Sequence, residues 1–275
     1  MPIALSTSPP APMHATLSSP MPLDQADGLR RLFAHSRTCV VPVVSNPFVA
    51  FGGVMLERLC TAFAEHGKHT LVIDAAERAQ PASELALLDL AEGIEPLSAQ
   101  VSYLAARGLP LRYVDSTGST ASFLRAVADA APQCEAVLVH ASASDLARMF
   151  ARSPDLDRIR PLLLADDRPA SVTHAYAALK LLTQRAGLVV HDLLLGAAKQ
   201  SPRSERIAMQ IATCADDFLG AVLRDWVRVD PACDAGEAPS HELRRLVREQ
   251  LRTAHGGDVL AAAVHAHAAP AWAHP

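Results

Sequence analysis

Short apolar runs alternate with amphipathic helical patterns along most of this 275-residue chain. Apolar runs of strand length predict strands at residues 38–44, 70–74, 111–114, 136–140, 160–165, 188–193 and 221–229. Apolar residues at helical spacing predict helices at residues 54–66, 83–90, 97–107, 121–131, 171–186, 204–215 and 240–254. Strands that alternate with helices predict an α/β fold: a doubly wound, mostly parallel sheet with helices on both faces.

Pro42 lies inside the first predicted strand. Proline has no backbone N–H, so it cannot donate to the hydrogen-bond ladder of a central strand. The residue therefore predicts a bulge in that strand.

Composition divides the chain into one folded domain and its flanking segments. Residues 1–22 contain six prolines among Ser, Thr and Ala, which predicts a disordered arm because such a segment buries little apolar surface. Residues 23–36 are predicted to form an N-terminal helix, and residues 37–255 the α/β domain. The Ala/His/Pro-rich residues 256–275 are predicted to form a flexible tail.

The charge and cysteine content limit the classes of function. A formal net charge of −4 argues against nucleic-acid binding through phosphate neutralisation, so no direct nucleic-acid contact is expected. The five cysteines are odd in number and far apart, which favours free thiols in a reducing compartment. No secretory signal or membrane-spanning apolar run is visible in the sequence, and a cytoplasmic protein is expected.

The loop that follows the first strand is the first place to look for chemistry. Ligands of doubly wound sheets bind at the carboxyl ends of the strands. Residues 45–53, with the sequence SNPFVAFGG, form this loop.

The start of the domain resembles the opening of MinD/ParA-like ATPases. The similarity lies in Val43-Val44-Ser45, in the helix after the loop, and in residues 67–74, GKHTLVID, at matching spacing. In that family a deviant Walker A loop, rich in Gly and Lys, joins the first strand to the first helix. The resemblance implies a P-loop NTPase fold.

Two further segments are similar to one branch of this family, the flagellar-number regulator FlhG (also called FleN). Residues 23–31, LDQADGLRR, resemble its N-terminal Asp-Gln-Ala-x-x-Leu-Arg motif. Residues 167–180, DRPASVTHAYAALK, resemble its Pro-Glu-Pro-x-Ser-Ile-Thr-Asp-Ala-Tyr-Ala segment. The resemblance spans about residues 22–254 and implies a role in flagellar biosynthesis, in the control of flagellar number or placement.

The loop lacks the groups with which a P-loop binds ATP. Such a loop holds phosphate with backbone amides and a lysine, and magnesium with a Ser or Thr hydroxyl. In the gap-free register Pro47 stands at the family's signature lysine, Gly52 at its Walker lysine and Gly53 at its magnesium-binding hydroxyl. The chain has no lysine before Lys68, so no register supplies one.

Other positions of the implied site depart from the family pattern as well. Asp74 is retained, but Ala76 replaces the carboxylate that is implied to act in hydrolysis. His140 stands at the Walker B aspartate and His191 at the adenine-reading asparagine. Bulky side chains stand at three glycine positions: Phe48, Val49 and Phe51. Phe48 and Phe51 are expected to obstruct phosphate. We expect a pseudo-ATPase with no catalytic residues and no cofactor.

His140 and His191 are expected near the old site, at the ends of their strands. Imidazole is a common metal ligand, so the pair could form a new metal site. No carboxylate or thiol lies at ligand spacing, which favours ordinary, partly buried histidines and no metal.

The N-terminal motif keeps its residues while the nucleotide site does not. The resemblance implies that this helix engages the partner GTPase FlhF, through Asp24, Gln25, Ala26, Leu29 and Arg30. Glutamines position the attacking water in other GTPases, which makes Gln25 the candidate for that role. The alternative is a short structural helix capped by Asp24, with Leu29 packed on the domain.

The last predicted helix, residues 240–254, has an apolar face and several arginines. A basic amphipathic helix can lie on a membrane, and relatives are implied to dock at the inner membrane this way. Packing against the sheet is the simpler interpretation.

The leading hypothesis is thus an FlhG-like regulator that acts through contacts with FlhF and other flagellar assembly proteins, without ATP hydrolysis. Two alternatives are an active MinD/ParA-like ATPase with an atypical P-loop, and a pseudo-ATPase scaffold for another envelope assembly.

Overall fold

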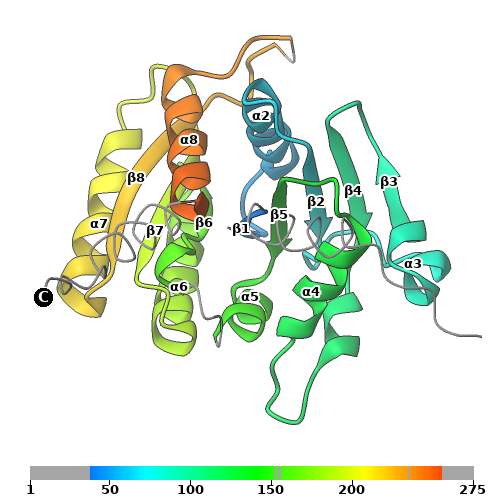
Figure 1. Ribbon diagram of the computed structural model, residues 1–275. Helices are drawn as coiled ribbons and strands as arrows, with labels where there is room; N and C mark the ends of the chain where they lie inside the picture. The colour runs from blue at the N-terminus through cyan, green and yellow to red at the C-terminus, as the bar shows by residue number, and fades with distance from the viewer. Residues whose placement is uncertain (1–37, 152, 154–155, 235, 256–275) are drawn as a thin grey trace, which may run out of the picture.

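A computed structural model describes residues 38–255, apart from residues 152, 154, 155 and 235 (Figure 1). The predicted arm at 1–22, the predicted helix at 23–36 and the predicted tail at 256–275 lie outside the described residues. No helix within the described part of the chain has both the length and the apolar character needed to cross a membrane.

The core of the fold is one eight-stranded sheet in the order β3-β4-β2-β5-β1-β6-β7-β8. All neighbouring strands are parallel except β3, which runs antiparallel to β4 at one edge. The strands are β1 (Cys39–Val44), β2 (Thr70–Asp74), β3 (Ile94–Pro96), β4 (Val101–Ala105), β5 (Ala136–Ala141), β6 (Leu162–Asp166), β7 (Val190–Gly196) and β8 (Val222–Val229). The predicted fold class is confirmed.

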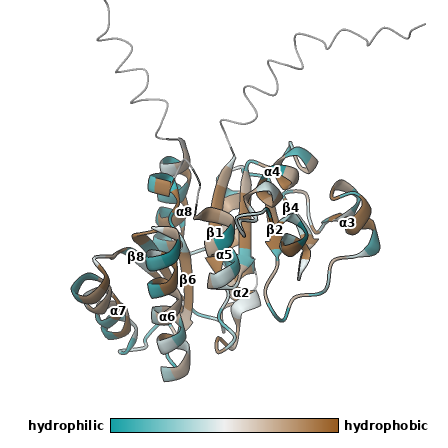
Figure 2. Ribbon diagram, turned by 90° about the horizontal axis from the view of Figure 1, so that it is seen from below, coloured by the Kyte–Doolittle hydropathy of each residue, from teal (hydrophilic) through white to brown (hydrophobic). Residues whose placement is uncertain are grey.

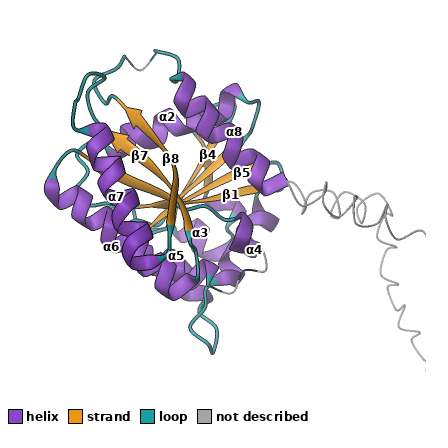
Figure 3. Cartoon of the chain, turned by 90° about the vertical axis from the view of Figure 1, so that its left-hand side faces the viewer, coloured by secondary structure: helices purple, strands orange, loops and turns teal. Residues whose placement is uncertain are grey.

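Helices cover both faces of this sheet (Figure 3). The α-helices are α2 (Gly52–Glu65), α3 (Glu84–Leu88), α4 (Ala121–Ala130), α5 (Ala143–Phe150), α6 (Pro169–Ala186), α7 (Ser204–Leu219) and α8 (His241–His255). Short 3₁₀ helices occupy Ala91–Gly93, Leu109–Tyr113 and Leu156–Arg158. Buried side chains of α2 and α8 share one core cluster, and those of α4 to α7 belong to the other, so the sheet separates two apolar layers. Apolar colour runs along the central strands in Figure 2, as expected for strands that are buried on both faces.

Two predicted elements between β2 and α4 were wrong. Residues 97–107 were predicted as a helix, but they include β4, whose residues alternate between half-buried and buried. Residues 111–114 were predicted as a strand, but Leu109–Tyr113 form a 3₁₀ helix. The turn before it begins at Gly108 with φ 78°, a left-handed conformation that glycine adopts without steric cost, and Pro110 suits the start of a helical turn.

Pro42 causes no bulge in β1. The strand stays in register with β5 from Cys39 to Val44. The amides of Cys39 and Ser45 donate toward β5, so by alternation position 42 faces β6. Pairing between β1 and β6 begins only at Val43, so the missing N–H of Pro42 interrupts no ladder.

Helix α8 packs against the sheet, as the simpler interpretation predicted. Its buried apolar side chains join the cluster that contains residues of α2 and β1: Leu243, Leu246, Val247 and Leu251. The apolar face that a membrane would need is therefore occupied in this structure.

Candidate functional site

Six of the seven positions singled out in the sequence line one cavity. It has a volume of about 270 Å³ and lies where β1, β2 and β5 end and α2 begins. The positions that it brings together are Pro47, Gly52, Gly53, Asp74, Ala76 and His140. The structure therefore brings these six positions together, whereas His191 lies elsewhere.

The loop from β1 to α2 is tied to β6 and α6 by Asn46. The buried Asn46 amide donates to the carbonyl oxygens of Leu164 and Ser171, at 2.8 and 2.9 Å. Its Oδ1 accepts the backbone N–H of Phe48 at 3.1 Å. The Asn46 side chain thus ties the loop to β6 and α6, and it also occupies the backbone N–H of Phe48.

Asp166, at the end of β6, holds the other part of the loop. Its Oδ2 accepts the N–H of Ala50 at 3.1 Å and the guanidinium of Arg168 at 2.6 Å. Arg168 also donates to the carbonyl oxygen of Phe48. Burial by itself favours the neutral acid, but the hydrogen bonds from Arg168 and from the amides of Ala50 and Arg168 outweigh it and lower the pKa of Asp166. The loop is therefore closed onto an ionised carboxylate.

The segment that resembles the FlhG motif, residues 167–180, supplies much of this support. The Ser171 hydroxyl accepts the N–H of Asp166 at 2.9 Å, and His174 meets the ring of Phe48 edge-on at 5.6 Å. Pro169 begins α6, where its missing amide costs no hydrogen bond. In this chain the segment positions the loop.

A carboxylate–imidazole pair occupies the floor of the cavity. Asp74, at the end of β2, lies 2.9 Å from Nδ1 of His140, near the end of β5. The other Asp74 oxygen accepts the hydroxyl of Tyr103 at 3.3 Å. Burial, with the charge and hydrogen bond of Asp74, raises the pKa of Tyr103 to about 12, so the phenol stays protonated. Asp74 is thus held by neighbouring side chains, and Ala76 offers no second carboxylate.

The first residues of α2 bring no positively charged side chain to the cavity. Gly52 and Gly53 open the helix, and Phe51 before them makes no side-chain cap. Of the described residues that line the cavity, Arg78 is the only Arg or Lys. A β-carbon at Gly53 would meet nothing within 4 Å, and one at Gly52 would meet only Val49 at 3.9 Å, so both positions have room for a side chain.

The predicted position of His191 was wrong. It lies near the amino end of β7, fully buried, with Nε2 3.2 Å from the Thr183 hydroxyl. The strand was predicted to end at residue 193, but its leucines continue it to Gly196, which takes the carboxyl end. Burial lowers the pKa of His191 to about 4, so the ring is neutral near pH 7.

The expected obstruction by Phe48 and Phe51 was also wrong. Neither side chain lines the cavity, and they are 47% and 56% exposed. Val49 does line it, from a buried position. Sequence reasoning missed three residues that hold the site: Asn46, Tyr103 and Asp166. Polar residues at or just beyond the carboxyl ends of buried strands are a signal that could have found Asn46 and Asp166.

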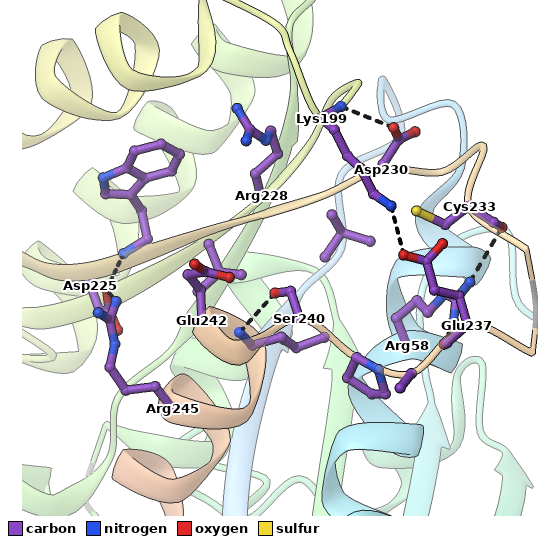
Figure 4. A pocket seen from close by; sticks show the side chains of 16 residues that line it. Arg58, Lys199, Asp225, Arg228, Asp230, Cys233, Glu237, Ser240, Glu242 and Arg245 are labelled. Atoms are coloured by element: carbon purple, nitrogen blue, oxygen red, sulfur yellow. Dashed lines mark hydrogen bonds and ion pairs between the residues drawn. The ribbon is translucent and has the colours of Figure 1, made fainter.

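A larger cavity, of about 590 Å³, lies between the end of β8 and the start of α8 (Figure 4). Several of the charged side chains that line it already bind other groups of the chain. Lys199 pairs with Glu237 at 2.6 Å, Arg245 pairs with Asp225 at 2.7 Å, and Arg58 donates to carbonyl oxygens of the loop before α8. Over residues 38–255, apart from those left undescribed, no three His, Cys, Asp or Glu side chains are grouped so that they could hold a metal ion.

Known structures share this fold. No protein-family model and no curated protein sequence matches the chain. Cobyrinic acid a,c-diamide synthase from Mycobacterium smegmatis, solved with an ATP analogue and magnesium, superposes with a TM-score of 0.53 at 14% identity, over 78% of this chain and 95% of that one. A putative plasmid partition protein from Borrelia burgdorferi B31, bound to AMPPNP, gives a TM-score of 0.51 at 9% identity, over 79% and 98%. The chain therefore shares the fold of these two proteins.

Proposed function

We propose that this chain is a regulator that uses the MinD/ParA-type fold for protein contacts and does not hydrolyse ATP. The observation that carries the proposal is the closure of the loop on Asp166, whose carboxylate accepts the Ala50 amide. In a working P-loop such amides face the phosphates of the nucleotide. Here a carboxylate of the chain itself takes one of them.

The electrostatics of the cavity support the same proposal. Asp74 and Glu77 line it together with Arg78, so acidic side chains outnumber the Arg and Lys side chains among the described residues of the lining. The cavity offers the triphosphate of ATP no lysine, and Gly53 supplies no hydroxyl for magnesium. The carboxylates of Asp74 and Glu77 also line the cavity. Each of these features weakens nucleotide binding.

The process that it regulates is proposed from the sequence resemblance. The FlhG-like motif at 23–31 and the segment at 167–180 both favour a role in flagellar number or placement. On this proposal Asp24, Gln25 and Leu29 contact an FlhF-type GTPase. The segment at 167–180 keeps the loop in one conformation without nucleotide.

Calorimetric titration of the full chain tests the proposal in two arms. Magnesium-ATP at millimolar concentration should give no binding heat and no shift of the melting temperature, because a ligand bound to the native state must stabilise it. The FlhF-type GTPase should bind and should turn over GTP faster. A shift of several degrees with magnesium-ATP contradicts the first arm, and an unchanged GTPase contradicts the second.

One observation favours a second candidate, an ATPase with an atypical loop. A cavity lies at the start of α2, and the backbone N–H groups in the first turn of α2 point toward the N-terminal end of the helix. ATP turnover that requires magnesium, and that the Asp74→Asn variant abolishes, would establish this candidate.

A further inference from the structure

The second half of α8 lies on charged groups that are buried against the sheet. Asp192 of β7 is 1% exposed, and Arg160, just before β6, is 3% exposed. Both contact α8, away from the cavity at the start of α2. Fully buried charges are costly unless they are paired and hydrogen-bonded, so their partners decide how well α8 is held.

The partners of Asp192 are incomplete. Its Oδ2 accepts the side-chain amide of Gln250, on α8, at 2.7 Å. Its Oδ1 is enclosed and has no hydrogen-bond partner among the described residues. In the register of the sheet it lies beside Asp225 of β8, a second carboxylate.

Arg160 is held by α8 and is also incompletely satisfied. One Nη donates to the carbonyl oxygen of Glu249 at 2.6 Å, and its own carbonyl accepts the Gln250 amide at 3.3 Å. Its Nε is enclosed and, within the described part of the chain, has no acceptor. Asp192 and Arg160 thus attract each other without full hydrogen bonding, and both bind one turn of α8.

The other elements around Asp192 also bring charged or titratable groups. Arg224 of β8 pairs with Glu249 of α8 at 3.4 Å. Arg245 of α8 pairs with Asp225, and these two side chains lie next to each other in Figure 4. From β1, the Cys39 thiol donates to the carbonyl oxygen of Gln250 at 3.6 Å. Burial raises the pKa of Cys39 to about 12, so this thiol does not titrate near neutrality. A cavity of about 300 Å³, walled mainly by these charged side chains, reaches the cluster from the surface.

We propose that Asp192 is a proton-controlled latch for α8: the neutral acid keeps the helix docked, and the ionised carboxylate weakens its docking. Burial raises the pKa of Asp192 from 3.8 to about 6 in the docked state and outweighs Arg160, Arg224 and the Gln250 hydrogen bond, which lower it, while Asp225 adds a smaller upward contribution. Undocking would expose Asp192 to water and return its pKa toward 3.8. The docked state therefore binds the proton more tightly and gains stability as the pH falls through 6.

The size of the effect follows from these two pKa values. Between pH 7.5 and pH 5, protonation should favour the docked helix about tenfold. Release would expose the apolar side chains of Leu243, Leu246 and Leu251, which are buried in the docked state. The latch would thus control access to an apolar surface near neutral pH.

Hydrogen exchange of the full-length protein tests the latch. After correction for intrinsic exchange rates, the opening constant of amides 246–251 should be about tenfold larger at pH 7.5 than at pH 5. Asp192→Asn, which keeps the shape but does not titrate, should show equal opening constants at the two pH values. The matched control is His66→Gln, since His66 contacts the Arg244 carbonyl of the same helix at 3.4 Å. This variant should keep the tenfold difference.

Two results would overturn the latch. One is a pH effect that survives in Asp192→Asn and disappears in His66→Gln. The other comes from the wild-type protein, which avoids any folding defect of a variant: side-chain carboxyl NMR should show Asp192 titrating near pH 6, and titration near pH 4 would contradict the proposal.

Discussion

Oδ2 of Asp166 lies 3.1 Å from the backbone nitrogen of Ala50, although 116 residues separate the two in the chain. The contact joins the end of β6 to the loop that begins at the end of β1. On the function proposed above, the Asp166 carboxylate takes a backbone amide that a working P-loop would offer to phosphate.

Removing this carboxylate should destabilise the domain. Asp166→Ala leaves the Ala50 amide without its acceptor and removes one of the two acceptors of the Arg168 guanidinium, so the free energy of unfolding should fall by about 1–3 kcal/mol. Asp167→Ala, at the exposed neighbouring acid, should change it by less than about 0.5 kcal/mol. Urea unfolding at pH 7 measures both. Since the pKa of Asp166 lies below its ordinary 3.8, its contribution should persist above that pH and disappear as the pH falls through the lowered value.

Restoring lysines alone should not restore ATP hydrolysis. The double variant Pro47→Lys and Gly52→Lys returns positive charge, and Gly52 has room for a side chain. The loop would remain closed on Asp166, and Ala76 and His140 would still offer no carboxylate. Phosphate release from ATP should stay at background, while circular dichroism confirms that the variant is folded. Measurable turnover would show that the site has lost less than we propose.

Replacing His140 with the acid that the family pattern implies should introduce a pH-dependent repulsion. In His140→Asp a second carboxylate would face Asp74, where an imidazole now lies at 2.9 Å. Two such acids cannot both ionise without cost, so stability at pH 7 should fall by roughly 1–3 kcal/mol relative to His140→Asn. The pair would have one raised pKa, so the loss should diminish as the pH is lowered toward 4. Equal stability of the two variants at pH 7 would mean that the acids do not interact.

Two substitutions in the N-terminal motif should affect the proposed partner GTPase differently, one its stimulation and the other its binding. Gln25→Ala in the full chain should reduce stimulation of GTP turnover but leave much of the affinity, because a water-orienting amide acts chiefly in the transition state. Leu29→Ala should instead weaken binding, since an apolar side chain contributes roughly 1.5–3 kcal/mol when fully buried. Turnover and affinity, measured with each variant, distinguish these roles. If Gln25→Ala stimulates as well as the wild type, the catalytic role is excluded.

The parallel sheet could be predicted from the sequence because its central strands are continuous apolar runs. Residues 70–74 were predicted with the observed bounds, and both faces of that strand are buried. The prediction for residues 97–107 failed because β4 is only five residues long, and so short an apolar run does not distinguish a strand from a helix.

The candidate site was predictable in place but not in detail. The carboxyl ends of parallel strands must meet at one edge of the sheet, which brings Asp74 and His140 together. The contact of Asp166 with Ala50 depends on the crossover of β6 beside β1, which local patterns do not encode. His191 was misplaced because its strand was predicted to end at residue 193, whereas β7 continues three residues further, to Gly196.

Within the described residues, β1 and β6 pair only through Val43 with Leu162 and Val44 with Leu163, and Pro42 and Pro161 directly precede these pairs. This is the shortest pairing between neighbouring strands of the sheet, and it lies between five strands on one side and three on the other. The Asn46 amide bonds across this junction to Leu164, so the loop after β1 adds a contact between the two parts of the sheet. We expect a force applied across the sheet to separate it first between β1 and β6, where the fewest backbone pairs hold it together.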